Sequence, residues 1–378
     1  MPRSFEISVN PEVIKWARES AGFSIEEITR KIKTYEKIEV GERKPTFRQL
    51  ELLSHLFKRP TSVFLLSEPP VEPSYSTSFR IMPKSEKYLS KELRLAIRKA
   101  RYYQSVANEL MKNLDVSTKP DITSASISED PSVIARRERD RISISIEKQF
   151  EFKNAYMAFN EWRKAIENLN ILVFQFRFPL EDARGFSLMD KEPPLIVLNT
   201  TDNILARIFT LFHEYAHILL EIPEIYANEQ TLTNQNMDVE NWCNEFASEL
   251  LIPQDVLKTE KEYQDFIFKR AGLEVLNNLS NKFRVSKHAM LTRFRTLNLV
   301  TWEEYENAVS KIRSQYEKEK GVSFYLPSYK KCLQEKGKKF ISLVMNSKKS
   351  GFITTAEAIE YLSLKLDSLK KVAESAGL

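Results

Sequence analysis

The chain has 378 residues, of which 42% are hydrophobic and 29% charged, and its formal net charge is +5. This composition is typical of a folded protein, and the length predicts about two to three domains. There is no run of about 18 apolar residues, so no membrane span is expected. The eight glycines form no phosphate-binding cluster, which excludes P-loop and dinucleotide-binding sites. Because Lys and Glu are mixed through most of the chain, the small positive charge does not by itself indicate a nucleic-acid partner.

The two cysteines, Cys243 and Cys332, are too few for a disulfide framework and fit a reducing compartment. No apolar signal region follows Met1. We therefore expect a cytoplasmic protein. Cys243 falls in an apolar helical pattern and is interpreted as a small core residue.

Residues 1–68 are predicted to form a compact helical unit. Asn10 followed by Pro11 is typical of a helix start. Ser24 and Glu27 have the spacing of a capping box that begins a second helix. A further helix is expected to begin near Thr46.

Two segments of this unit, Trp16–Ser24 and Glu39–Thr46, resemble a helix-turn-helix of the Xre/Cro repressor type. The resemblance implies a helix that enters the major groove of DNA. Only six residues separate Ile32 from Glu39, fewer than that family uses for its turn and recognition helix. Basic residues remain for phosphate contacts, which position a protein without specifying sequence: Lys31, Lys33, Lys37, Arg43 and Lys44. DNA binding by this unit is one hypothesis, and packing or dimerisation is the other.

Residues 69–130 are expected to form a linker and a helix. The stretch 69–85 is rich in Pro and Ser, which is typical of a linker. The apolar spacing of residues 90–113 predicts a helix, and a loop follows at 116–132. The opposite face of this helix carries Arg94, Arg98, Lys99 and Arg101. We expect that face to be solvated, with a contact to nucleic acid or an acidic protein as the alternative.

Three short apolar runs, 171–176, 184–189 and 195–199, predict strands of a small sheet. The third run leads into a helix that Thr200 to Asp202 are expected to cap.

That helix carries the pattern His213-Glu214-x-x-His217, which includes two of the four histidines in the chain. On a helix this spacing places both imidazoles on one face, where they can share a single metal ion. Glu214 can then reach a metal-bound water and act as a general base. The alternative is that both histidines are ordinary helix residues with an incidental glutamate between them.

A catalytic zinc needs a third protein ligand and one open position. A helix predicted to begin near Val239 and to end at Pro253 offers three carboxylates, Glu240, Glu245 and Glu249. Spacing alone does not choose among them.

Together, Phe209–His217 and Glu240–Pro253 resemble the ImmA/IrrE family of zinc metallopeptidases. In that family H-E-x-x-H is followed by an E-x-x-A-N-x-F-A segment; here Glu240, Asn244, Phe246 and Ala247 match it, and Cys243 takes the usual alanine place. The resemblance implies that Glu240 is the third zinc ligand beside His213 and His217, with Glu214 as the general base. Further similarity covers 184–187, 194–199 and 283–299, and the tail around 337–340 and 351–354 resembles the long, Xre-fused members.

Several further residues are candidates near this site. Nothing in the sequence identifies an oxyanion stabiliser; Tyr215 and Tyr226 lie near the motif, and packing is an equal alternative for both. His288 is expected at the surface and not as a ligand. The strand at Leu195–Leu198 is expected to be a sheet edge that binds a substrate backbone by strand addition.

The predicted fold class is α+β and mainly helical. It comprises a helix-turn-helix-like bundle (1–68), a linker and helix (69–130), a zincin-like ImmA/IrrE-type metallopeptidase domain with a small sheet (131–300) and a C-terminal helical module (301–378). The first functional hypothesis is a regulatory zinc endopeptidase that cleaves a specific protein partner such as a repressor. The second is a DNA-binding transcription regulator or antitoxin-type protein of a toxin–antitoxin or mobile-element locus, with the peptidase-like domain as a scaffold.

Overall fold

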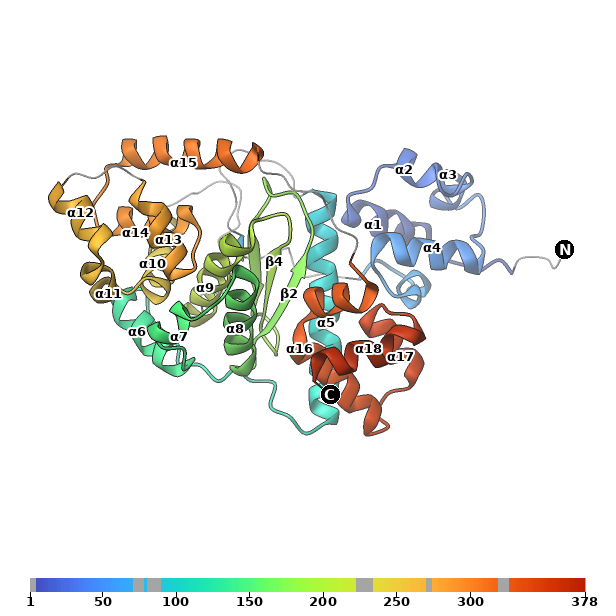
Figure 1. Ribbon diagram of the computed structural model, residues 1–378. Coiled ribbons are helices and arrows are strands. Elements are labelled where there is room, and N and C mark those ends of the chain that lie inside the picture. The colour runs from blue at the N-terminus through green and yellow to red at the C-terminus, as the bar shows by residue number, and fades with distance from the viewer. Residues whose placement is uncertain are drawn as a thin grey trace.

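The computed structural model describes residues 5–70, 78–79, 90–221, 234–269, 274–318 and 326–377. Most of the predicted linker and Tyr226 lie outside these residues. The described part is mainly helical with one small sheet, as the α+β prediction required (Figure 1). None of the described helices combines the length and apolar character needed to cross a membrane.

In the described part of the chain, the sheet has four strands in the order β1-β3-β4-β2. The strands are β1 (Ser78–Phe79), β2 (Leu172–Phe176), β3 (Gly185–Leu188) and β4 (Leu195–Asn199). β2 runs parallel to β4, whereas β3 runs antiparallel to both β4 and β1. The last three strands confirm the apolar runs identified in the sequence.

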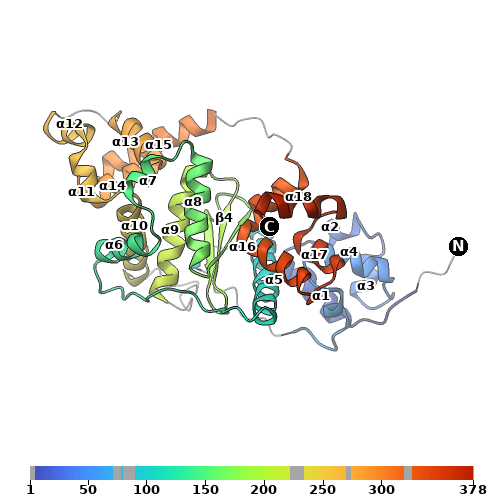
Figure 2. The same cartoon turned by 60° about the horizontal axis from the view of Figure 1, so that its bottom comes forward.

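Helices cover both faces of the sheet (Figures 1 and 2). One face packs against α8 (Ala155–Asn168) and α9 (Ile204–Leu220), and the other against α5 (Lys91–Asn113) and α16 (Ser328–Lys349). A strand covered on both sides is apolar at nearly every position, which explains the nearly continuous apolar runs in the sequence.

The prediction that Leu195–Leu198 forms a sheet edge is wrong. β4 pairs with β2 along one side and with β3 along the other, so it is an inner strand. Alternate side chains of β4 enter the two cores: Leu195 and Val197 pack towards α5 and α16, and Ile196 and Leu198 towards α8 and α9. Such a strand has no polar face for solvent and is therefore suited to the interior. On the side of β4 away from β2 lies β3, and β1 pairs with the far side of β3.

The N-terminal unit folds around its own apolar core. Its helices are α1 (Pro11–Ala21), α2 (Ile25–Thr29), α3 (Tyr35–Glu39), α4 (Phe47–Phe57) and the short 3₁₀ helix η1 (Thr61–Leu65). The predicted starts are confirmed, because Asn10 caps α1, and Ser24 and Thr46 form capping boxes at α2 and α4.

The predicted solvated basic face of α5 is wrong. The Arg98 side chain is only 9% exposed and donates to the backbone carbonyl of Phe57 at the end of α4. The other basic residues of this face also bind within the chain: Arg94 to the carbonyl of Glu19, Lys99 to Glu335, and Arg101 to Asp190. The basic residues of this face bind other parts of the chain because the N-terminal unit and the C-terminal helices dock onto α5 (Figure 1).

The remaining helices form two groups. The first lies beyond α9: α6 (Pro131–Arg141), α7 (Ile146–Phe150), α10 (Asn234–Leu251), α11 (Gln254–Thr259), α12 (Lys261–Lys269), α13 (Val275–Phe283), α14 (Lys287–Thr296) and α15 (Trp302–Lys318). The second comprises α16, α17 (Thr355–Leu362) and α18 (Leu366–Ala376), with α16 packed on β2. α10 begins five residues before the predicted start near Val239, and Ser286 caps α14.

Candidate metal centre

Three side chains from α9 and α10 converge on one point. The Nε2 atoms of His213 and His217 lie 3.2 Å apart. Glu240 approaches both histidines, with Oε2 3.2 Å from Nε2 of His213 and Oε1 3.4 Å from Nε2 of His217. One ligand atom from each residue lies within 4.8 Å of the other two. The sequence pattern predicted the histidine pair, and α10 supplies the carboxylate.

The donor set suits a catalytic zinc ion, because two imidazoles and one carboxylate leave one position for water. His213 is fully buried, whereas the Glu240 side chain is 39% exposed, so the cluster is open on the glutamate side. Burial raises the pKa of Glu240, but the two neighbouring imidazoles outweigh it and hold that pKa well below its usual range. The carboxylate is therefore ionised, as a ligand must be.

The two other candidate carboxylates of α10 point elsewhere. Glu249 is buried in an ion pair with Arg293 of α14 and accepts from the backbone N–H of Gln254. Glu245 accepts from the hydroxyl of Ser132 at 3.5 Å. Among the described residues, the possible metal ligands that lie together are His213, His217 and Glu240. Glu245 and Glu249 are not among them.

Glu214 lies on the side of α9 that faces the sheet. It is fully buried, and its Oε2 accepts a hydrogen bond from the Ser187 hydroxyl of β3 at 3.0 Å. This hydrogen bond fixes one carboxylate oxygen of the residue that follows His213 in α9. Ser187 lies within the segment 184–187 that resembles the family, but a single serine in a strand carries no signal of what it faces.

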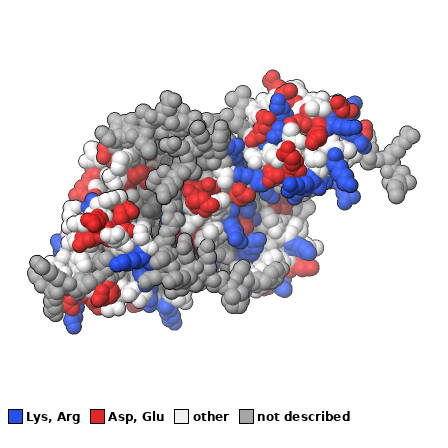
Figure 3. Space-filling view, turned by 90° about the horizontal axis from the view of Figure 1, so that it is seen from above, with Lys and Arg blue, Asp and Glu red and all other residues white. Residues whose placement is uncertain are grey.

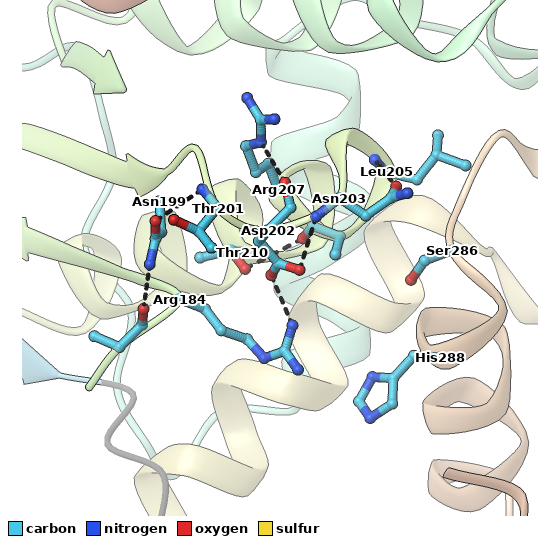
Figure 4. Close-up of polar contacts among 12 residues, drawn as sticks. Arg184, Asn199, Thr201, Asp202, Asn203, Leu205, Arg207, Thr210, Ser286 and His288 are labelled. Carbon is cyan, nitrogen blue, oxygen red and sulfur yellow. Dashed lines mark hydrogen bonds and ion pairs between the residues drawn. The ribbon is translucent and has the colours of Figure 1, made fainter. Parts of the chain in front are cut away.

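Two further contacts hold β3 against α9. A Cβ on Gly185 would lie 2.6 Å from Cγ2 of Thr210 and 2.9 Å from the backbone oxygen of Val197, so only glycine allows this close approach. Arg184, immediately before β3, pairs with Asp202 at 2.6 Å (Figure 4). β3 is thus fixed to α9 at successive levels along the helix, from its start to the level of Glu214.

The start of α9 is held by a polar network, part of which Figure 4 shows. The cap is Asn203, whose Oδ1 accepts from the N–H of Leu205, so the predicted cap at residues 200–202 falls one residue short. Arg207 donates to the backbone carbonyl of Asp202 and to the side chain of Gln175 on β2. These bonds anchor α9 to the loop before it and to the sheet.

Tyr215 faces away from the metal cluster. Its hydroxyl donates to Oε2 of the buried Glu138 on α6 at 2.6 Å, so it is a packing residue and not an oxyanion stabiliser. Tyr226 lies outside the described residues. His288 is half-buried on α14, where its Nε2 lies 3.4 Å from the hydroxyl of Tyr305, and it takes no part in the metal cluster.

Cys243 is a fully buried core residue, as predicted, and its thiol also contacts the imidazole of His217. Burial raises the pKa of the thiol. The sequence offered no sign of this contact, although Cys243 lies three residues after Glu240 and hence on the same side of α10.

A family model described as "IrrE N-terminal-like domain" matches residues 166–295. The matched segment runs from the end of α8 into α14 and contains all three residues of the metal cluster as well as Glu214. It supports the resemblance to the ImmA/IrrE family and a peptidase-type class for this part of the chain. Neither the curated proteins nor the solved structures contain a match to the chain.

Proposed function

We propose that this protein is a zinc-dependent endopeptidase that cleaves a specific protein partner, such as a repressor. The observation that carries the proposal is the convergence of His213, His217 and Glu240 beside a buried Glu214. A family model for IrrE-like domains matches the same segment, which suggests a regulatory, metallopeptidase-like role.

In the proposed reaction His213, His217 and Glu240 hold the ion. When bound, zinc supplies Lewis acidity that lowers the pKa of a water and polarises a peptide carbonyl. Glu214 accepts a proton from the attacking water and delivers it to the amine that leaves. The hydrogen bond from Ser187 holds one Glu214 oxygen in place. The orientation of the carboxylate is therefore defined for the proton transfer.

The proposal predicts a separation of metal binding from hydrolysis. Glu240→Ala should lose bound zinc, because two imidazoles alone give a weaker site. Glu214→Gln should keep the zinc and lose hydrolysis by about 10²–10⁴-fold, the usual effect of removing a general base. Zinc content is measured on the purified full-length proteins. Hydrolysis is measured as new protein N-termini in an extract of the organism's own proteins.

Glu245→Ala is the matched control, because Glu245 lies on the same helix and outside the cluster. It should bind zinc as the unaltered protein does. Zinc retained by Glu240→Ala would refute the ligand assignment. If the Glu214→Gln variant produces as many new N-termini as the unaltered protein, the proposed peptidase activity is refuted.

The alternative, a DNA-binding regulator, would rely on the N-terminal unit. In α3, Tyr35 and Ile38 are buried and Glu39 is bound to Arg18, which leaves Glu36 and Lys37 directed outwards. Figure 3 shows Lys and Arg interspersed with Asp and Glu on this unit. Base recognition needs several side chains that reach the groove of DNA, and α3 presents few. The mixed charge of the surface also offers little attraction to phosphates. Both observations favour the peptidase as the primary activity.

A further inference from the structure

A hollow of about 820 Å³ lies where α8 and α16 meet. These two helices cover opposite faces of the sheet, and both contact β2, the outer strand of the described sheet on the side away from β1. The walls of the hollow come from α8, from the middle of α16 and from the end of α18. The hollow therefore lies at the β2 edge of the sheet, between the metal-centre half of the fold and the C-terminal helices.

The floor of the hollow is a buried ion pair. Arg163 and Glu167 of α8 are at most 6% exposed, and Nε of Arg163 donates to Oε1 of Glu167 at 2.9 Å. The two other guanidinium nitrogens donate to the backbone carbonyls of Gln334 on α16 and Val173 on β2. Because the two charges of the floor neutralise each other, the charge that a ligand would meet comes from the walls.

Three lysines line the walls, Lys164 on α8 and Lys338 and Lys339 on α16. Lys164 and Lys338 are exposed, and among the residues that the structure describes neither is in an ion pair. Lys339 is half-buried, and its Nζ donates to the backbone carbonyl of Glu167 at 2.7 Å, which leaves two of its three N–H groups for other acceptors. The other acidic residue of the lining, Glu161, is shared with a lysine outside the hollow, 3.8 Å away. The walls therefore carry an excess of positive charge.

Lys339 is held partly out of water beside a carboxylate that is already paired. Burial lowers the pKa of its ammonium group, and the attraction of Glu167 offsets this only in part. Glu167 cannot be a full counter-charge for Lys339 because it is bound to Arg163. A negatively charged group in the hollow would favour the charged form of Lys339.

We propose that the hollow between α8 and α16 binds a phosphorylated small molecule of about nucleotide size. Lysine ammonium groups bind phosphate as point charges, and one phosphate group carries up to two negative charges to match those of the walls. The hollow is larger than a phosphate, and its volume lies in the range of small-molecule sites, about 300–1,000 Å³. This binding goes beyond the proposed hydrolysis and needs no zinc.

The remaining lining suits the rest of such a ligand. Met157, Asn160, Lys164 and Asn168 recur along α8 at steps of three or four residues, so they share one face of the helix. The two asparagine amides offer both donors and acceptors for a sugar or a base, and Met157 offers an apolar contact. On α16 the helix is interrupted at Gly337, where φ is 74° and ψ is 165°, and the two lysines that follow line the opposite wall.

The test measures the binding of inorganic pyrophosphate to the full-length protein by isothermal titration calorimetry. The protein is first freed of metal with a chelator and moved to chelator-free buffer, because an ion at the metal centre would also bind the probe. Pyrophosphate should bind with a Kd of about 1 mM or tighter, which two or three charge-assisted contacts can supply. Lys164→Gln/Lys338→Gln should weaken binding by about tenfold or more. Absence of saturable binding, or equal affinity of this variant, would overturn the proposal.

Lys348→Gln/Lys349→Gln is the matched control, because it removes the same charge from the far end of α16, outside the hollow. It should bind pyrophosphate as the unaltered protein does. Equal weakening in both variants would show that overall charge attracts the probe, and the proposed site would be wrong. A short DNA duplex is the second probe. If the duplex binds through Lys164 and Lys338 while pyrophosphate does not, these lysines contact nucleic acid and the small-molecule site is refuted.

A footprint locates the site without a variant. Exposed lysines of the metal-free protein are acetylated with acetic anhydride, and mass spectrometry measures the rate at each position. Pyrophosphate at about ten times its Kd should slow acetylation of Lys164 and Lys338 about tenfold, because only about a tenth of the sites then remain free. Lys348 and Lys349 should react at an unchanged rate. If pyrophosphate protects neither Lys164 nor Lys338, the hollow is not its binding site.

Discussion

Glycine at position 185 is the residue that allows the sheet to touch α9, the helix of the two metal-site histidines. With no side chain there, β3 approaches α9 closely enough for the Ser187 hydroxyl to reach Glu214 at 3.0 Å. The neighbours of the missing Cβ are Cγ2 of Thr210 and the backbone of Val197, neither of which is the far end of a flexible side chain. The orientation of the proposed general base therefore depends on a residue that cannot itself take part in chemistry.

Gly185→Ala should destabilise the fold by about 1–3 kcal/mol, the usual cost of overpacking a core. It should also weaken zinc binding, because separation of β3 from α9 disturbs the side of the helix next to His213. Chemical denaturation measures the free energy of unfolding, and a zinc-binding titration measures the affinity.

Thr210→Ser supplies the control and the rescue, because it removes Cγ2 and keeps the hydroxyl that donates to the carbonyl of Ala206. In the double variant, part of the lost stability should return, as expected for two groups in direct contact. Since the Val197 oxygen remains 2.9 Å away, the rescue should be incomplete. Additive effects of the two substitutions would contradict the proposed contact.

Three of the four predicted site residues share one property, whereas Glu240 on α10 was implied by the family resemblance. His213, Glu214 and His217 lie within five positions of one helix, so helical periodicity alone determines how they face each other. Ser187 and the Cys243–His217 contact could not be found in this way. They depend on the register of β3 and on how α10 crosses α9, which only the packed fold determines.

At the scale of single elements, the clearest example is the link between α1 and α3. Arg18 of α1 binds Glu39 of α3 through two hydrogen bonds, of 2.8 Å from Nε and 2.7 Å from Nη2, and donates from Nη1 to the carbonyl of Phe23. Both charged side chains are at most 10% exposed. A two-pronged bond of this kind fixes direction as well as distance, so it holds the short helix α3 against α1.

The pKa of Glu39 predicts how this link depends on pH. Burial raises the pKa, but the hydrogen bonds from Arg18 outweigh it, so the pKa lies below its ordinary value of 4.5. Glu39 is thus ionised in the folded and the unfolded chain above pH 4.5, and its contribution to stability is complete there. As the pH falls through the folded-state pKa, the carboxylate takes up a proton and the contribution is lost.

We therefore expect Glu39→Gln to reduce the stability of the N-terminal unit by about 1–3 kcal/mol at pH 7, the range for hydrogen bonds to charged groups. The difference from the unaltered protein should shrink below pH 4.5. Hydrogen exchange of the α1 and α3 amides, corrected for the intrinsic effect of pH, measures it. Glu36→Gln, on the exposed side of α3, should have little effect at any pH; a pH-independent deficit in Glu39→Gln would count against the ion pair.

Helix starts could be predicted because a cap residue and the N–H groups that it binds are close neighbours in sequence. Asn10, Ser24 and Thr46 are examples. The break within α16 could not be predicted in this way. At Gly337 the backbone adopts φ 74°, and a Cβ there would collide with the buried pair Arg163–Glu167 of α8. The carboxylate of Glu167 also accepts from the N–H of Lys339. These partners lie about 170 residues apart in the chain, so no local pattern connects them.

For the molecule as a whole, α5 is the element onto which the other parts dock. The N-terminal unit is bound to its first turns, and α16 lies along it on the same face of the sheet (Figure 1). Helical periodicity identified the apolar face of α5 correctly, but it could not tell a solvated basic face from one that docks another unit. Arg98 marks the difference, since a guanidinium that is only 9% exposed must find its partners within the protein.

This arrangement predicts that two arginines on one helix differ sharply in importance. Arg98→Met removes a donor from the buried carbonyl of Phe57 and should loosen the N-terminal unit by about 1–3 kcal/mol. Arg101→Met removes a solvent-accessible pair with Asp190, worth at most about 1 kcal/mol. Limited proteolysis of the full-length proteins should then cut between residues 58 and 90 about tenfold faster in Arg98→Met, and at the unaltered rate in Arg101→Met. Equal rates in the two variants would show that Arg98 does not hold the N-terminal unit to α5.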